Sequence, residues 1–427
     1  HAGVMVALMF VAALGQGSAN SMYSLEAHPL PPRLVHMGFT FFFYPVKTFK
    51  PTALLPMYEM PPDAAFFEPQ ILYRAIIGAA VLLVALFLWR AAVAIAVTWA
   101  VFFLFILPTS GLTQAGSQIA ADRYSYLSCL SFAFLAGGSL FLLARGRVGT
   151  WIGAALGSVL VGTCVVLTHA QCGVWKDTRS LWEYVHAQQP DNTFALDSLG
   201  HIKIGESKAE QDPEKKKQLI RDAMELHDKA FQLKGDARHL LNFAEATHDM
   251  AFADEEQFDL WVKRAFDICE RGFKLADEQG VRYQLPWYRT RGSIYIDLGR
   301  FEEAARDLEL YTQDRTNQLD LEAFVFLGMT YVELKKPKEA EATLAYVVKQ
   351  NPAEVRAWAS LGQLYMTNGF LEPAKSALNK VLELQAAAGG VDPQANALAG
   401  NRGQVNYAAA KGALNSATKA LAIELAS

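Results

Sequence analysis

The sequence predicts an all-α protein in which several membrane-spanning helices are followed by an α-solenoid of stacked helical hairpins. Two observations carry this prediction. Long apolar runs fill much of the first 170 residues, whereas charged residues concentrate between about residues 203 and 380. In the charged part, glycines recur 36 and 34 residues apart, at Gly292, Gly328 and Gly362. Self-similarity with a period of this size is typical of repeats that bury their apolar faces only by stacking.

The membrane prediction rests on four apolar runs, each about as long as a helix that crosses a bilayer core of roughly 30 Å. Arg74 is their one formally charged residue. A partial or interfacial helix is expected before them, because residues 39–58 combine aromatic side chains with lysines, which suit the headgroup level. We therefore predict a membrane domain over residues 1–170, in which the run at 3–14 is the remainder of a truncated helix. The four predicted spans are residues 71–89, 92–108, 126–143 and 150–170.

Basic residues in the short loops predict the orientation. Arg90 lies between the first two spans, and Arg145 and Arg147 lie between the third and fourth. Because cytoplasmic loops carry an excess of Lys and Arg, this side is expected to face the cytoplasm. The sequence therefore predicts an integral membrane protein whose repeats are periplasmic in a bacterium or luminal in a eukaryote.

A connector at residues 171–191 leads into the predicted repeats at residues 192–388. Around each glycine, an aromatic residue stands four positions before, a tyrosine three after, an alanine twelve after and a leucine sixteen after. Two degenerate hairpins precede these copies, beginning near Asn192 and Ala237. The pattern resembles the tetratricopeptide repeat, and the resemblance implies binding of a protein or peptide. The recurring residues are Tyr288, Phe324, Trp358; Tyr295, Tyr331, Tyr365; Ala304, Ala340, Ala374; and Leu308, Leu344, Leu378.

The first helix of each hairpin is expected to build the concave wall of the solenoid. Its charges are mixed, and it includes methionines, which suit an extended peptide. The alternative is that these side chains only solvate helix faces. The predicted peptide-groove residues are Arg289, Asp297, Glu322, Glu333, Arg356 and Gln363.

The loop at residues 107–128 contains the stretch Ala-Asp-Arg-Tyr-Ser-Tyr-Leu, beginning at Ala121. It resembles the loop before a late membrane helix in the transmembrane-and-TPR O-mannosyltransferase group and its bacterial relatives. The resemblance covers roughly residues 30–384. It implies a GT-C type membrane fold and sugar transfer from a lipid phosphate. That family's catalytic carboxylate belongs to an earlier loop that this chain lacks, so we expect a truncated relative and nominate no catalytic residue.

Arg123 and Gln118 are the candidate contacts to the donor phosphate. A planar guanidinium forms bidentate, charge-assisted hydrogen bonds to phosphate oxygens. The alternative is that Arg123 pairs with Asp122 or with headgroups, while Tyr124 and Tyr126 belong to an interfacial aromatic belt.

After a small-residue linker at residues 389–399, residues 400–427 resemble the active-site helix of short-chain dehydrogenases. The resemblance implies that Tyr407 is a general acid and that Lys411 lowers its pKa. The glycine-rich loop that binds the dinucleotide is missing from the sequence. We therefore expect a vestigial fragment and no cofactor.

Three functional hypotheses compete: a membrane-anchored binding scaffold, which we favour, part of a glycosyltransferase, and a dehydrogenase fusion. The expected partners are membrane lipids, a peptide or protein in the groove, and a lipid-linked sugar. A net charge of −4 without a basic patch argues against nucleic acid. Four scattered cysteines give no metal-ligand spacing, so no metal is expected.

Overall fold

The structure, a computed structural model, describes residues 28–112, 116–144, 146–280 and 285–387. The chain divides into two compact units, His1–Ala195 and Leu196–Ser427. The predicted linker and the dehydrogenase-like segment, with Tyr407 and Lys411, lie outside the described residues.

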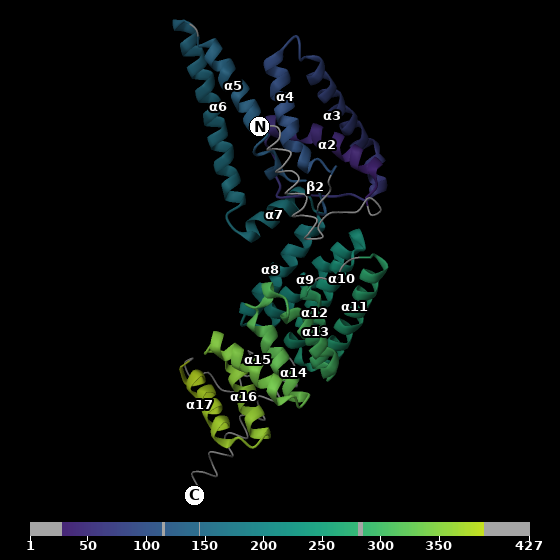
Figure 1. The fold of residues 1–427 in the computed structure, drawn as a ribbon, viewed down its shortest axis with the longest axis vertical. Coiled ribbons are helices and arrows are strands. Elements are labelled where there is room, and N and C mark those ends of the chain that lie inside the picture. Colours follow the sequence, from purple (N-terminus) through teal and green to yellow (C-terminus); the bar gives the residue numbers. More distant parts are fainter. Residues whose placement is uncertain (1–27, 113–115, 145, 281–284, 388–427) are drawn as a thin grey trace. The chain divides into compact units, whose positions relative to one another are not determined.

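The first unit is helical, with one short antiparallel strand pair and three 3₁₀ turns among its described residues (Figure 1). In the strand pair, Tyr58 lies opposite Ala120 and Glu59 lies opposite Gln118. The pair therefore joins the segment around residue 58 to the loop around residue 119. The elements are α2 (Leu30–Phe49), β1 (Tyr58–Glu59), η1 (Asp63–Phe67), α3 (Pro69–Phe87), α4 (Val93–Ile106), η2 (Leu107–Thr109), β2 (Gln118–Ala120), η3 (Asp122–Ser125), α5 (Cys129–Leu143), α6 (Arg147–Val174), α7 (Thr178–Gln188) and the first turn of α8 (Thr193–Ala209).

Helices α3 and α6 are long and apolar enough to cross a membrane, with 19 and 28 residues. The other two predicted spans form shorter helices, α4 with 14 residues and α5 with 15. At about 1.5 Å per residue, such a helix covers only about 20–23 Å. The 3₁₀ turn at Pro108 ends the first of them, and the turn at Asp122 delays the start of the second. Two long apolar helices are a weak indication of membrane association, because the core helices of soluble proteins have the same composition.

Helix α2 begins nine residues before the interfacial segment that the sequence suggests at residues 39–58, and much of it is buried. Its Gly38 meets Gly78 of α3 so closely that a Cβ on Gly78 would collide with the carbonyl oxygen of Gly38. Phe41 packs on Phe103 of α4 with ring centroids 4.6 Å apart. Tyr44 is fully buried. These aromatic residues therefore form a core with neighbouring helices.

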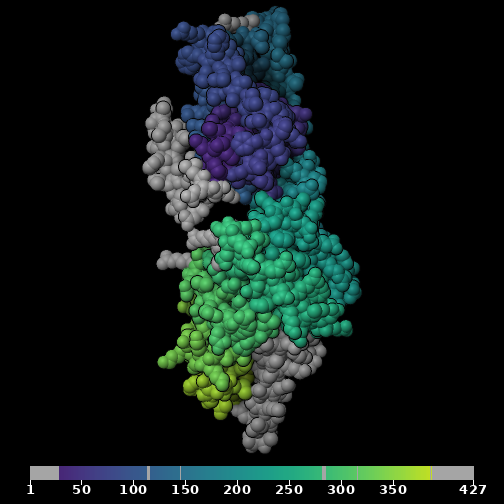
Figure 2. All heavy atoms as spheres, turned by 90° about the vertical axis from the view of Figure 1, so that its right-hand side faces the viewer, coloured from purple at the N-terminus to yellow at the C-terminus, as the bar shows by residue number. Residues whose placement is uncertain are grey.

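The second unit is a series of helical hairpins that follow one another in sequence order (Figure 1). The space-filling view shows the same order as a run of colour from teal to yellow (Figure 2). The predicted all-helical repeat fold is confirmed. Helix α8, most of which belongs to this unit, pairs with α9, and four further hairpins follow among the described residues. Their helices are α9 (Pro213–Lys234), α10 (Ala237–Ala253), α11 (Phe258–Glu278), α12 (Leu285–Asp297), α13 (Phe301–Thr312), α14 (Leu321–Glu333), α15 (Pro337–Gln350), α16 (Val355–Thr367) and α17 (Leu371–Ala387), with short η4 (Glu255–Gln257) and η5 (Arg315–Asn317) turns.

Each recurring glycine lies where the two helices of its hairpin come closest. A Cβ on Gly328 would lie 2.6 Å from Cγ and Cδ2 of Leu344, and Gly362 faces Leu378 in the same way. Real Cβ atoms essentially never approach other atoms that closely. The sixteen-residue spacing from glycine to leucine is therefore the spacing of this contact.

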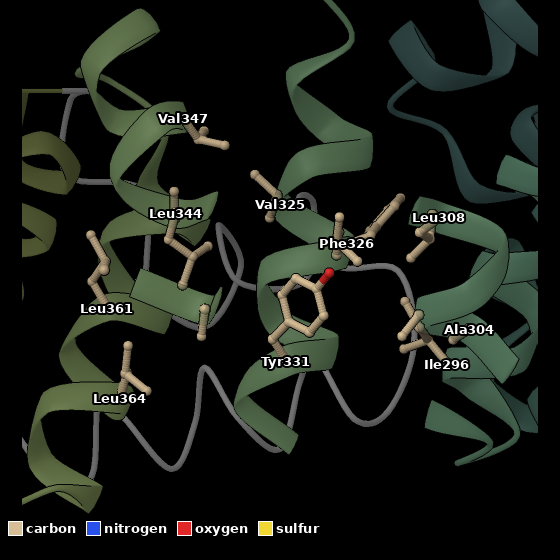
Figure 3. Packing of buried hydrophobic residues seen from close by; sticks show 14 of the residues in the cluster. Ile296, Ala304, Leu308, Val325, Phe326, Tyr331, Leu344, Val347, Leu361 and Leu364 are labelled. Carbon is tan, nitrogen blue, oxygen red and sulfur yellow. The ribbon is translucent and has the colours of Figure 1, made fainter. Parts of the chain in front are cut away.

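Neighbouring hairpins share one apolar core rather than each enclosing its own. Figure 3 shows side chains of successive helices pointing into a common layer, with Phe326 and Tyr331 of α14 between Leu308 on one side and Leu344 on the other. Phe326 is 2% exposed although it sits on the first helix of a hairpin. A single hairpin could not bury such residues alone, so the hairpins depend on one another.

The first two hairpins keep the close contact but change the residues that make it. In α8, Gly200 faces the imidazole of His227, because a Cβ there would lie 2.5 Å from Nε2. In the second hairpin the roles are exchanged. Gly272 lies on the second helix and faces Leu241 on the first. These exchanges explain why the two hairpins look degenerate in the sequence.

Replacing Gly328 with alanine is expected to destabilise the array, because the new methyl group meets the Leu344 side chain. Overpacking of this kind costs about 1–3 kcal/mol, which exceeds the gain of about 1 kcal/mol in helix propensity. Hydrogen exchange of α14 and α15 amides in the full chain measures the change. Gly205→Ala is the matched control, since Gly205 is helical with nothing within 4 Å of its Cβ position. It should leave exchange unchanged or slow it. Equal effects of both variants would contradict the packing argument.

Candidate functional site

A ladder of ion pairs crosses the first helices of three hairpins, the helices that are expected to line the inner surface of the array. Glu322 of α14 occupies the centre of this ladder. Its Oε2 lies 2.6 Å from Nη2 of Arg289 on α12, and its Oε1 lies 3.3 Å from Nη1 of Arg356 on α16. Asp320 and Glu354, in the adjoining turns, lie 2.9 and 3.0 Å from the Nε atoms of the same two arginines.

The ion pairs of the ladder give Arg289 and Arg356, both predicted groove residues, a structural role. Both guanidinium groups are partly buried, with side chains 18% and 24% exposed, and both are bound by two carboxylates. Three of these four contacts are charge-assisted hydrogen bonds, which are stronger than bonds between neutral groups, and the contact of Arg289 Nε with Asp320 is an ion pair. The arginines therefore tie successive hairpins together, and their charge is already neutralised by the chain itself.

Asp297 and Glu333 stand at the same place in successive hairpins, five residues after the glycine, but their environments differ. The Asp297 side chain is only 3% exposed, and its Oδ2 lies 2.7 Å from Nε2 of His248 in the preceding hairpin. Glu333 is exposed. Gln363 is half-buried on α16. Of the six predicted groove residues, the structure thus exposes Glu333 most and buries Asp297.

Two acids on the inner surface lack an ion-pair partner within the described part of the chain: Glu245 of α10 and Glu333 of α14. Glu245 follows Ala244 on α10, and it is half-buried. The inner surface therefore keeps uncompensated negative charge after the internal pairs are formed.

The recurring tyrosines add a hydrogen bond at successive hairpin interfaces. Tyr331 donates its hydroxyl to Glu309 of the preceding hairpin at 2.8 Å, and Tyr365 donates to Glu341 at 2.8 Å. Tyr295 makes a longer contact of 3.4 Å with Glu270. Burial, followed by the hydrogen bond to Glu341, raises the pKa of Tyr365 to about 12. The sequence pattern predicts the packing of these rings but does not identify the carboxylate that each hydroxyl meets.

Arg291 of α12 is bound by an aromatic ring and a carboxylate within the array, although the sequence pattern does not mark it. Its guanidinium lies 3.7 Å from the ring centroid of Phe273, and it binds both carboxylate oxygens of Asp307 at 2.6 and 3.0 Å. Burial alone would lower the pKa of Arg291, but the bonds to Asp307 outweigh it and raise the pKa. Arg291 therefore joins the second and third hairpins and is a structural residue.

In the first unit, Arg123 lies on η3 with an exposed side chain. Its Nη1 donates to the carbonyl oxygen of Pro56 at 2.5 Å, and its guanidinium lies 5.0 Å from the ring centroid of Tyr124. Gln118 donates to the hydroxyl of the same tyrosine at 2.8 Å. The structure thus brings the two predicted phosphate contacts together around Tyr124.

Asp122 binds the neighbouring segment and makes no ion pair with Arg123 in the described part of the chain. Its Oδ2 accepts hydrogen bonds from the Leu55 amide at 2.6 Å and from the Tyr58 hydroxyl at 2.8 Å. Burial raises the pKa of Asp122, whereas these hydrogen bonds oppose the rise. Asp122 therefore links the loop before α5 to the segment at Leu55 and Tyr58, next to the strand pair. No group of three or more His, Cys, Asp or Glu residues in the described ranges is placed to hold a metal ion.

Comparison with known proteins supports the repeat assignment. The tetratricopeptide repeat family matches residues 355–387, the hairpin of α16 and α17. This chain contains a tetratricopeptide-repeat region. The other tetratricopeptide-like hairpins show the same stacking, although the family match covers only the last one. No curated protein matches the chain significantly.

Solved structures that are similar to this chain include YrrB, a tetratricopeptide protein, together with MamA and PilF. YrrB, described as having an unusual peptide-binding site, is 17% identical, with a TM-score of 0.34 over 48% of this chain and 92% of its own. MamA is 16% identical, with a TM-score of 0.34 over 48% and 97%. PilF of Pseudomonas aeruginosa is 16% identical, with a TM-score of 0.34 over 52% and 89%. These likenesses are too distant to say anything further about this chain.

Proposed function

We propose that this tetratricopeptide-repeat protein is a membrane-anchored scaffold whose array binds an extended peptide segment of another protein. The observation that carries the proposal is the inner surface itself. It combines the exposed carboxylate of Glu333 with the half-buried Glu245, Gln363 and Met366 on the first helices α10, α14 and α16. Polar and flexible apolar side chains of this kind suit an extended chain that contacts several helices in turn.

The charge of the inner surface favours a ligand with lysine or arginine side chains. The arginines that would attract a carboxylate are engaged by Glu322, Asp320 and Glu354. Breaking such pairs to bind an acidic ligand would leave partly buried charges uncompensated, which is costly. Glu245 and Glu333 need no such rearrangement, so a basic peptide adds favourable pairs without breaking existing ones.

Glu333→Lys is expected to weaken the binding of a basic peptide about tenfold, which corresponds to about 1.4 kcal/mol. The reason is that the change replaces attraction by repulsion at the inner surface. Fluorescence anisotropy with a pool of labelled lysine-rich peptides and full-length protein in detergent measures the affinity at low and at physiological salt, since added salt screens the effect.

Glu302→Lys serves as the matched control, because Glu302 is an exposed acid on α13, the second helix of its hairpin. It changes the net charge by the same amount and should leave the affinity unchanged. If the two variants weaken binding equally, only the net charge matters and the inner surface is not the binding site.

We infer that the first unit anchors the array in a membrane. The support comes from the exposure of the two long apolar helices. Only 6% of the most apolar 18-residue stretch of α6 is buried, and only 17% of that of α3. Large apolar side chains along α6 are exposed, including Trp151 at 74% and Val166 at 68%. In water, this much exposed apolar surface is unfavourable, whereas in lipid it is matched to its surroundings. Arg90 and Arg147 favour a cytoplasmic position for the loops that contain them.

A cysteine introduced at the exposed Lys336 is expected to react with a membrane-impermeant maleimide in intact cells or spheroplasts, because the proposed topology places the array outside the cytoplasm. The exposed native thiols of Cys164 and Cys172 are first replaced with serine. A cysteine at Arg90, on the opposite side in this topology, is the control and should react only after permeabilisation. The reverse labelling pattern would invert the topology.

A second candidate function is recognition of a lipid-linked sugar donor through its phosphate, and one observation favours it. Arg123 is exposed and bonded to the neutral Pro56 carbonyl, with its aromatic neighbour Tyr124 fixed by Gln118. A guanidinium held at one nitrogen keeps other N–H groups for an anion. The resemblance to glycosyltransferases of the GT-C type motivates this candidate. We assign no catalytic step to it.

Arg123→Lys is expected to weaken the binding of a long-chain polyprenyl phosphate about tenfold although the charge is kept, because the planar fork that spans two oxygens is lost. Binding is measured by calorimetry with the full chain in nanodiscs, and the uncharged polyprenol is the ligand control. Arg179→Lys, at a 46% exposed arginine outside this loop, is the control variant. Equal affinity of Arg123→Lys and the unchanged protein would limit Arg123 to a structural role.

A further inference from the structure

The first hairpin of the array has a histidine at the place where the third, fourth and fifth hairpins have a leucine. His227 of α9 covers Gly200 of α8, as Leu344 covers Gly328. A titratable ring thus occupies the closest contact of this hairpin. The remaining atoms of the ring are also buried, since the His227 side chain is only 2% exposed.

His227 belongs to a buried cluster that spans three helices. The two carboxylate oxygens of Asp197 on α8 each accept a hydrogen bond from a histidine. The donors are Nδ1 of His227 at 2.9 Å and Nδ1 of His239 at 2.8 Å. The Asp197 side chain is 10% exposed and that of His239 is 0% exposed. Arg238 of α10 approaches the same carboxylate at 3.8 Å.

Two more titratable groups face this cluster. His201 of α8 stacks edge-on against His227, with ring centroids 5.0 Å apart. Glu245 of α10 is close enough to interact electrostatically with His227. The groups that surround His227 are therefore Asp197 and His201 from α8, and Arg238, His239 and Glu245 from α10.

The hydrogen bonds and charges of the cluster are satisfied when both histidines that bind Asp197 are neutral. Each then donates one N–H to one carboxylate oxygen, and the single negative charge faces Arg238. One further proton places a positive charge in a buried site. On His239 that proton would sit on Nε2, a buried atom with no hydrogen-bond partner in the described residues. Burying an unpaired polar group is unfavourable, and burying a charge is more so.

We propose that the Asp197–His227–His239 cluster is an acid-sensitive latch, which holds α8 and α9 on α10 at neutral pH and releases them in mild acid. The latch would shorten the array by one hairpin and remove its inner surface at that end. It adds a regulatory property to the array and does not depend on which ligand the array binds.

The direction of the pH effect follows from proton linkage. Burial lowers the pKa of His227, although Asp197 opposes the shift. The closed hairpin therefore binds fewer protons than the open one, and its stability falls as the pH drops through about 6.5. Burial alone would raise the pKa of Asp197, but its bonds to the two histidines lower it overall. This carboxylate loses its stabilising contribution only below about pH 4. Between pH 7.5 and 5.5, His227 decides the outcome.

Hydrogen exchange of the full chain in detergent tests the latch at pH 7.5, 6.5 and 5.5, with protection factors corrected for intrinsic exchange rates. Protection of α8 and α9 is expected to fall at least tenfold across this range, whereas that of α14 and α15 stays within about threefold. A uniform fall in every hairpin, or no fall in α8 and α9, would overturn the proposal.

His227→Leu installs the residue that later hairpins use and should abolish the pH dependence while keeping the hairpin closed. His239→Gln is the second variant, since it removes the other titratable ring while keeping a hydrogen-bond donor. His248→Gln is the control, because that histidine binds Asp297 in a pair of its own, at 2.7 Å. It should leave the response of α8 and α9 unchanged. If the response persists in the first two variants, the cluster is not the latch.

Discussion

The array depends on one steric constraint: the two helices of a hairpin approach until a side chain of one rests on the bare Cα of the other. Gly292, Gly328 and Gly362 allow this approach, and a leucine sixteen residues later fills the contact. Once the two helices are locked at this distance, the aromatic and alanine positions face the next hairpin and bury a shared core. The ion-pair ladder and the tyrosine bonds hold hairpins that are already in register.

The periodic part of the fold could be predicted from the sequence because its contacts are short-range. A glycine and its leucine lie within one hairpin, so their spacing repeats. The same logic fails for His227, which lies 27 residues from Gly200 because the helices of that hairpin are longer. It also fails for apolar runs such as that of α4, because apolar composition alone does not reveal where a 3₁₀ turn ends the helix.

The residue types of the candidate sites could be predicted from the sequence, but the partners that these residues bind could not. The charges on the first helices are visible in the sequence, yet Asp297 is buried by His248, which lies 49 residues earlier. Arg123 bonds to Pro56, 67 residues earlier. Such partners come from different elements, and no periodicity links them. Long-range packing therefore decides which of several similar side chains remains available to a ligand.

The shared core also governs how the array forms. The helix contacts from α9 to α17 join each hairpin to itself or to its neighbour, so the array has a low contact order. Low contact order favours rapid folding, and stacked repeats extend from any folded nucleus. A nascent or newly translocated chain could add one hairpin at a time as it emerges. In such a sequence, α8 and α9 are the first pair to emerge and await α10, which completes their buried cluster.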